Sequence, residues 1–553
     1  RMAWVAGLRW FPWRPITGFG LILTLVLAGV VLILPGIGQL SILDREEARF
    51  VQHSRDQFQA VESDGTLDGS GAYPSSLVHQ FQMTFVDLTQ LPDNILPYRL
   101  MSASGVLVAA LLVFGLGRSM FNQHVGWMAS LATLGAPLVV WDAKQAKADM
   151  WLMAATVATV WLVWWLWRGQ SGQPVRRRAV VPLGVAVAFG IMVKGPVLLW
   201  LVVLAGLTLV AFDRSLERLR ALRPLSVAFA ALVAMFGWLM VSVPAQSWSS
   251  LMSTVSLGIL VPHVEEATAP AYRPIAHLLM LPLFLWPLSL FLLDAIRLCW
   301  VERDGPRLFL LAWIVPGWVM FEFLPEKQWH HVVPLLPLLA LLSASAVTSW
   351  VKVDGIGRNT LLVLWGFVGA AMPTGVWLIW GNAMLAGQLD SFAAGSSLWF
   401  CVILGSSFFL IALAVRFAAS GKATAAVCAA IGMVAGTSSA LCTQALPAYQ
   451  GVWLTDAIVS SLESSSGRSP ASPDGPVLGV IGYEEPSLVF ATHGRVVIGV
   501  ETPWQWVQDA PDRWLLDDGS LGALPENLVL ARQLRGYCIP EGKRLDLRLI
   551  RPQ

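Results

Sequence analysis

The chain has 553 residues, of which 56% are hydrophobic and only 13% are charged. Ordinary soluble domains carry about 25% charged residues, so this composition excludes a typical soluble protein and indicates a chain that crosses a membrane many times. The net charge of only +2 gives no support for a nucleic-acid partner.

Apolar runs long enough to cross a membrane recur along most of the sequence. A span needs about 20 mostly apolar residues. The expected fold class is therefore a polytopic α-helical membrane protein with about 13 transmembrane helices within residues 1–444. The candidate spans are 16–37, 98–117, 122–140, 150–167, 179–193, 196–212, 224–244, 275–296, 308–324, 331–349, 359–381, 395–415 and 423–444.

Basic residues in the connecting loops predict the orientation of the chain. If the N-terminus is cytoplasmic, the loop after each even-numbered span is cytoplasmic too. Each of these loops is basic, as the positive-inside rule requires. One member from each is Arg118, Arg177, Arg218, Arg303, Lys352 and Arg416. An odd number of spans then places the C-terminus outside.

Three longer pieces, residues 38–97, 245–274 and 445–553, fall on the predicted outer side. Residues 38–97 and 245–274 are expected to be loops, and the Ser/Gly/Pro-rich stretch within 445–476 is expected to be a linker. The short runs VLGVIG, SLVFAT, RVVIGV, NLVLAR and DLRLI follow it, broken by turns and a helix. They predict a small α/β domain over residues 477–553.

Charged residues that the cytoplasmic loops do not account for gather at the outer ends of the spans. They include cations, which the positive-inside rule makes scarce on this side. Because all of these residues share one membrane face, they can converge on one outward-facing cavity that holds a buried anion. They are Asp44, Arg45, Glu46, Glu47, Arg49, Lys144, Lys147, Asp149, Lys194, Glu265, Glu266, Glu322, Lys327, His330 and His331.

Each of these residues also has a simpler interpretation. Asp149 precedes an apolar helical run and suits an N-cap, while Lys194 begins a Lys-Gly-Pro sequence that suits a solvated turn. His330 and its neighbour suit polar positions at the membrane surface. The stretch LDREEARF, residues 43–50, suits a solvated helix start in which Glu46 is favoured by the helix dipole.

A mixed set of carboxylates and cations suits the transfer of a group away from a phosphate. A carboxylate can take a proton from an acceptor hydroxyl. Arg, Lys and His side chains can neutralise the charge that develops on the departing phosphate. The membrane would supply a lipid substrate with its phosphate at this depth.

Five motifs, in the same order along the chain, resemble those of the aminoarabinose transferase and protein O-mannosyltransferase superfamily of GT-C membrane glycosyltransferases. LDREEARF is similar to the D-E-A-R-Y/F motif of the first outer loop in that superfamily. AKADMWLM and VKGP are similar to its A-K-T-D-A-x-L and (T/I)-K-G-P segments. FEFLPEKQWHHVVPLLP is similar to its F-E-x-x-P-T-K-L-P-H-Y segment, and GYEEPSLVF to a motif of the outer tail domain in bacterial members.

The resemblance implies an inverting transfer from an undecaprenyl-phosphate sugar on the periplasmic side of a bacterial inner membrane. Glu46 stands where the superfamily carries its catalytic aspartate, and Asp149 matches the second acidic position. If the longer side chain of Glu46 does not place its carboxylate correctly, Asp44 is the alternative catalytic carboxylate. The positions that match donor-binding residues are Arg49, Lys194, Lys327 and His330. No dedicated metal site is expected, although a divalent cation bridging phosphate and carboxylate stays open.

The sequence departs from the superfamily pattern in ways that keep alternatives open. Glu46 replaces an aspartate, His331 replaces a tyrosine, and no lysine precedes Pro74 in the first loop. The protein is therefore either an active glycosyltransferase with lipid A, another glycan or a protein as acceptor, or a catalytically impaired partner built on the same fold. A secondary transporter is a third hypothesis, disfavoured because the middles of the spans carry almost no charge and the halves do not repeat.

Overall fold

The computed structural model describes the chain from residue 18 to residue 553 with interruptions. The described ranges are 18–42, 45–64, 77–168, 177–214, 220, 222–242, 275–302, 305–324, 327–347, 350, 356–385, 394–448, 453–538 and 543–553. The predicted outer loop over 245–274 and the Pro74 stretch lie outside them.

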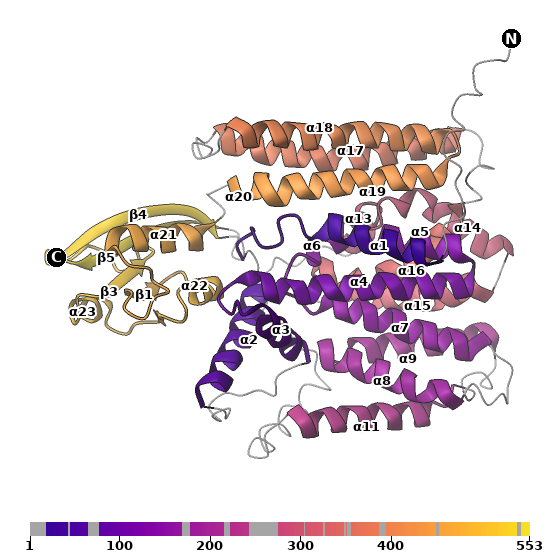
Figure 1. Ribbon diagram of the computed structural model, residues 1–553, viewed down its shortest axis with the longest axis horizontal. Coiled ribbons are helices and arrows are strands. Elements are labelled where there is room, and N and C mark those ends of the chain that lie inside the picture. Colours follow the sequence, from indigo (N-terminus) through magenta and orange to yellow (C-terminus); the bar gives the residue numbers. More distant parts are fainter. Residues whose placement is uncertain are drawn as a thin grey trace, which may run out of the picture.

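A bundle of apolar helices makes up most of the molecule, and most of these helices run side by side in Figure 1. Every one of the thirteen predicted spans coincides with one or more of them. The helices of the bundle are α1 (Gly18–Ile33), α4 (Ile95–Met120), α5 (Gln123–Leu134), α6 (Pro137–Asp142), α7 (Asp149–Arg168), α8 (Arg177–Lys194), α9 (Val197–Asp213), α11 (Pro224–Ser242), α13 (Ala276–Phe284), η3 (Leu288–Phe291), α14 (Leu292–Glu302), α15 (Gly305–Glu322), η4 (Trp329–Leu335), α16 (Leu336–Ala344), α17 (Ile356–Leu385), α18 (Ala394–Ala419), α19 (Ala423–Ala440), η6 (Leu441–Ala445) and α20 (Leu446–Ala448).

Only some of these helices are long and apolar enough to cross a membrane by themselves. Within the described ranges, five helices are long and apolar enough to cross a membrane, and a sixth span results if one bent pair is counted as a single crossing. That pair, 276–284 with 288–301, bends by 110° where one continuous span was predicted over 275–296. The count of 13 transmembrane helices therefore stays a prediction.

Burial follows the pattern expected for a protein with lipid around it. A large apolar core joins α4, α5, α7, α15 and α16, with Val106, Trp313 and Leu338 fully buried in it. Large apolar side chains such as Phe229 and Phe367 instead point outward from α11 and α17. Outward apolar faces of this extent are stable when hydrocarbon rather than water surrounds them.

Two helices, α2 (Arg45–Asp64) and α3 (Leu77–Thr89), occupy the segment predicted as the first outer loop. They pack against each other at the end of the bundle where the C-terminal domain also lies (Figure 1). Glu46 and Glu47 stand in the first turn of α2, where the helix dipole favours negative charge. The motif LDREEARF is thus a helix start, but not the solvated one of the simpler interpretation, because Glu46 and Glu47 are both buried.

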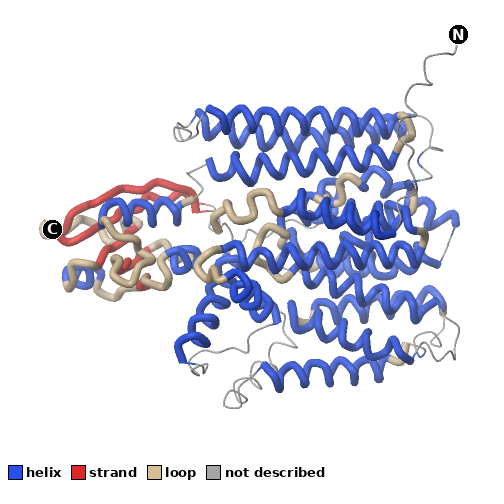
Figure 2. The backbone as a smooth tube through the Cα atoms, in the orientation of Figure 1, coloured by secondary structure: helices blue, strands red, loops and turns tan. Residues whose placement is uncertain are grey.

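The C-terminal region contains a five-stranded mixed sheet in the order β2-β1-β3-β5-β4, drawn in red in Figure 2. β1 runs parallel to β2 and β3, and β5 runs antiparallel to β3 and β4. SLVFAT, one of the short runs of the sequence, falls on a helix, α22. The elements are α21 (Leu454–Ser466), β1 (Val477–Ile481), α22 (Pro486–Ala491), β2 (Val496–Ile498), α23 (Pro503–Gln508), β3 (Arg513–Asp517), β4 (Leu528–Cys538) and β5 (Lys543–Pro552).

The predicted linker over 445–476 needs correction, because much of it is ordered structure. Helix α21 lies inside this range, and its apolar side chains Leu454, Ile458 and Leu462 pack in one cluster with Leu478 and Leu547 of the sheet. The linker prediction followed the Ser/Gly/Pro content and overlooked these apolar residues at helical spacing.

Candidate active site

Glu46 lies at the centre of a cluster of charged side chains that come from four separate segments. Its carboxylate oxygens are 3.5 Å from Lys147 Nζ, 3.5 Å from Lys194 Nζ and 3.8 Å from His330 Nε2. The Glu46 side chain is only 8% exposed. A single buried carboxylate therefore faces three groups that are cations or can become cations.

Asp149, the first residue of α7, is the second carboxylate of this cluster. Lys194, the last residue of α8, donates hydrogen bonds to both of its oxygens at 2.9 and 3.0 Å. Asp149 is almost fully buried, whereas the Lys194 side chain is 23% exposed. Lys194 thus bridges the two carboxylates and still reaches the outside of the cluster, so it is not a solvated turn residue.

The cations determine the protonation state of Glu46. Burial alone would raise the pKa of the Glu46 carboxyl, but the charges of Lys194, His330 and Lys147 outweigh burial and hold that pKa well below its ordinary value. Glu46 is therefore ionised at neutral pH, ready to accept a hydrogen bond from a hydroxyl group.

Glu47 and Arg99 form a neighbouring ion pair that the sequence did not predict. Arg99 donates to both oxygens of Glu47, at 2.8 and 3.0 Å, and to the carbonyls of Ile37 and Leu40. Glu47 also accepts a hydrogen bond of 2.8 Å from the backbone nitrogen of Ala146. These bonds fix the start of α2 against the segment that carries Lys147 and Asp149.

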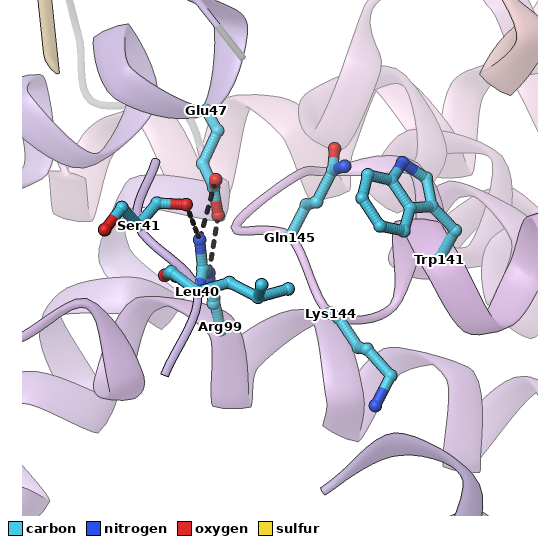
Figure 3. Close-up of a pocket in the computed structure, with 7 residues that line it drawn as sticks. All are labelled: Leu40, Ser41, Glu47, Arg99, Trp141, Lys144 and Gln145. Carbon is cyan, nitrogen blue, oxygen red and sulfur yellow. Dashed lines mark hydrogen bonds and ion pairs between the residues drawn. The ribbon is translucent and has the colours of Figure 1, made fainter. Parts of the chain in front are cut away.

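Figure 3 shows the small pocket beside this pair, with the Arg99 guanidinium facing Glu47. The pocket is lined by Leu40, Ser41, Glu47, Arg99, Trp141, Lys144 and Gln145. Lys144 does not contribute its charge to the Glu46 cluster, because its ammonium donates to the carbonyls of Ile33 and Pro35 at 2.8 and 2.5 Å. This cation therefore ties down the chain that follows α1.

Lys327 forms its ion pair with a carboxylate other than Glu46 and Asp149. Its Nζ is 3.7 Å from Glu322, and His277 Nδ1 is 3.6 Å from the same carboxylate oxygen. His330, only three residues further on, turns toward Glu46 because the chain enters the 3-10 helix η4 between them. The two predicted residues thus belong to two adjacent charge groups.

Three further predicted residues lie elsewhere or cannot be placed. Arg49 is exposed on α2, one turn beyond Glu46. His331 Nδ1 accepts a hydrogen bond of 3.3 Å from the Gln328 backbone nitrogen, which assigns it to the start of η4. Asp44 lies outside the described residues.

The cluster also contains the atoms that a metal ion would need. Glu46, Asp149 and His330 each offer one donor atom, and these atoms lie within 4.8 Å of one another. Oxygen and imidazole ligands of this kind suit a divalent cation. Lys194 Nζ, however, already supplies a positive charge between the two carboxylates.

Comparison with known proteins shows which fold carries this site. Residues 79–241 match a family model described as dolichyl-phosphate-mannose-protein mannosyltransferase. No curated protein matches the sequence. The fold is that of the GT-C membrane glycosyltransferases, and the resemblance inferred from the motifs is confirmed.

Within that fold class the chain is similar to ArnT from Cupriavidus metallidurans. Crystal structures of ArnT bound to undecaprenyl phosphate and in the apo state each match with a TM-score of 0.71 and 16% identity, over 96% of this chain and 98% of ArnT. The apo oligosaccharyltransferase of Archaeoglobus fulgidus matches with a TM-score of 0.50 and 11% identity, over 91% of this chain and 70% of that protein.

Proposed function

We propose that this protein is an inverting glycosyltransferase that moves a sugar from a polyprenyl phosphate, such as undecaprenyl phosphate, to a hydroxyl of an envelope acceptor such as lipid A. It acts at the periplasmic face of a bacterial inner membrane, with its N-terminus in the cytoplasm. The observation that carries the proposal is the buried Glu46 carboxylate, faced by Lys147, Lys194 and His330. The GT-C fold supports an enzyme over a transporter.

The proposed reaction uses these groups in one displacement. The acceptor oxygen attacks the anomeric carbon of the sugar, and the bond between that carbon and the phosphate oxygen breaks with its electron pair left on the phosphate. Attack from the opposite face inverts the anomeric centre. Glu46 takes the hydroxyl proton, with Asp149 orienting the acceptor.

The cations of the cluster stabilise the departing polyprenyl phosphate. Lys194 is the first candidate, because it is partly exposed while it bridges both carboxylates. Positive charge placed in advance where negative charge develops is a large contribution to rate. When phosphate shares the charge of Lys194, Glu46 loses part of the interaction that keeps its pKa low. Donor binding would therefore make Glu46 a stronger base.

Glu46→Gln tests the proposal directly. The variant keeps the size of the side chain but can no longer accept a proton, so we expect sugar transfer to fall by about a hundredfold or more. The measurement is mass spectrometry of envelope lipids from cells with and without the protein, followed by transfer assays with purified protein. Glu501→Gln, an exposed change in the C-terminal domain, is the matched control.

A second variant separates the effect of the negative charge at position 46 from the effect of side-chain length. Glu46→Asp keeps the anion among its cations and should fold normally, while its shorter arm reduces transfer. Full activity of Glu46→Gln in folded protein would reject Glu46 as the base. A wild-type protein that transfers no sugar from any polyprenyl donor would support the impaired partner instead.

A further inference from the structure

The C-terminal domain contacts α2, the helix that carries Glu46, and one residue at this contact is a buried arginine. Arg55 is 1% exposed, and its guanidinium donates a hydrogen bond of 2.7 Å to the carbonyl of Phe490. The same guanidinium lies 4.7 Å above the centre of the Phe490 ring. Phe490 belongs to α22, so a residue of the distant C-terminal domain holds Arg55 by both its backbone and its ring.

Phe490 also completes an apolar cluster between the two parts of the molecule. Val51 of α2, Val86 of α3, Tyr98 of α4 and Ala146 surround it. The Tyr98 ring meets the Phe490 ring edge to face at 6.2 Å. Ala146 in turn donates its backbone N–H to Glu47, so the cluster extends from the C-terminal domain to the residue beside Glu46.

The contacts of α2 follow one stripe along the helix. Glu47, Val51 and Arg55 are spaced four residues apart and therefore share one face. Glu47 is held by Arg99 and Ala146, whereas Val51 and Arg55 are both held by contacts that include Phe490. Glu46 and Glu47 are consecutive residues of one rigid helix, so a rotation of α2 about its axis would change the distances between Glu46 and its cations.

We propose that Arg55 and Phe490 are positioning residues through which the C-terminal domain sets the rotation of α2 and so the place of Glu46. The catalytic consequence rests on the proposed function, whereas the docking itself does not. GYEEPSLVF, whose last residue is Phe490, then acts as the part of the C-terminal domain that holds the catalytic helix.

The test compares Phe490→Ala and Arg55→Met with a change at another contact between the domains. His493 Nε2 lies 3.4 Å from Asp93 at a more exposed position, so His493→Ala, which leaves the backbone of α22 unchanged, is the matched control. Phe490→Leu and Arg55→Lys are conservative variants that keep, respectively, apolar volume and charge. Thermal unfolding of each purified protein shows that it is folded.

Kinetics provide the first readout. We expect Phe490→Ala and Arg55→Met to lower kcat on the order of tenfold to a hundredfold, with KM for the polyprenyl donor changed less than about threefold, because a small misplacement of a reacting group slows the chemical step. Phe490→Leu should recover most of kcat, and His493→Ala should match the wild type. Unchanged kcat in both test variants would overturn the proposal.

The pH profile separates positioning from a loss of folded protein. A Glu46 that lies further from Lys194 and His330 would have a higher pKa, so the acidic limb of kcat/KM should move to higher pH in Phe490→Ala. A reduced amount of folded enzyme would lower the profile without moving it, and that result would count against positioning.

Hydrogen exchange tests docking without relying on sugar transfer. Amides 46–56 of α2 should exchange faster in Phe490→Ala and Arg55→Met than in His493→Ala. Faster exchange in a protein that shows no transfer in any form would support docking while rejecting the proposed function. Equal exchange in all variants would overturn docking, whatever the activity.

Discussion

At the level of single residues, the cluster depends on burying opposite charges together. Glu46 and Asp149 are buried carboxylates, and Lys194 contacts both. A buried ion pair gains little over an apolar replacement, but removing one partner leaves an uncompensated charge. Such a cluster is therefore better explained by chemistry than by stability.

Lys194→Ala should harm both stability and donor use. Loss of the ammonium leaves buried Asp149 without the partner that bonds both its oxygens, which we expect to cost about 3–5 kcal/mol of unfolding free energy. Transfer should fall further, with a raised KM for the polyprenyl donor. Denaturant or thermal unfolding and donor titrations measure the two effects.

The double variant Lys194→Ala with Asp149→Asn isolates this pair. Removing both charges should restore much of the stability lost in the single variant, because no unpaired charge remains buried. Additive losses of stability in the double variant would show that the two residues are not coupled. An unchanged KM for the polyprenyl donor in Lys194→Ala would exclude Lys194 from the phosphate site.

At the level of elements, α2 and α3 are joined by polar groups that include a buried histidine. His79 Nδ1 is 2.7 Å from Ser54 Oγ, and the Ser54 hydroxyl donates to Gln82. Because the serine gives its proton to Gln82, the His79 ring donates to Ser54. Burial, with a smaller effect of His53, lowers the pKa of His79 to about 3.

This pKa makes the packing of α2 on α3 sensitive to acid. In the unfolded chain His79 titrates near its ordinary pKa of 6.5, whereas in the folded protein it stays neutral down to about pH 3. The unfolded state therefore binds the extra proton first, and stability should fall by up to about 1.4 kcal/mol per pH unit between about 6.5 and 3. Thermal unfolding across this range measures the slope.

His79→Asn is the matched variant, because its amide nitrogen can replace Nδ1–H as the donor to Ser54 without titrating. The variant should lose less stability than the wild type as pH falls from 6.5. An identical slope in both proteins would assign the acid sensitivity to other groups.

The sequence predicted the elements of the bundle better than the details of their contacts. Each of the thirteen apolar runs coincides with one or more of the described helices, since a lipid-facing helix needs only a continuous apolar sequence. They could not show the 110° bend between 276–284 and 288–301, which depends on how neighbouring helices pack. Nor did Ser/Gly/Pro content reveal α21, whose apolar face is stabilised by the sheet.

The site was predicted in outline for a similar reason. Charges that are expensive within a membrane draw attention in an apolar sequence, and this signal found Glu46, Asp149, Lys194 and His330. The same signal was available for Arg99, which is a lone cation inside an apolar run. Its ion pair with Glu47 was not predicted, because Glu47 was grouped with Glu46. No local pattern separates Lys327 from His330, because their different directions depend on the turn into η4.

At the level of the whole molecule, α2, which carries Glu46, and the C-terminal domain lie at the same end of the bundle (Figure 1). Contacts between Arg55 and Phe490 and between Ser41 and Asp456 join that domain to the membrane part. One measurement of the side on which the C-terminal domain lies therefore also determines the side from which substrates reach Glu46.

Reporter fusions at Gln553 should place this end in the periplasm. The six predicted cytoplasmic loops are all basic, and losing one span would invert every later loop. Alkaline phosphatase, which folds only outside the cytoplasm, should therefore be active when fused at Gln553, and green fluorescent protein exported there should be dark. Fusions truncated after residue 172, in a predicted cytoplasmic loop, should give the reverse result and serve as the control. Fluorescence at Gln553 would show that the Glu46 cluster faces the cytoplasm, and this result would contradict transfer to a periplasmic acceptor.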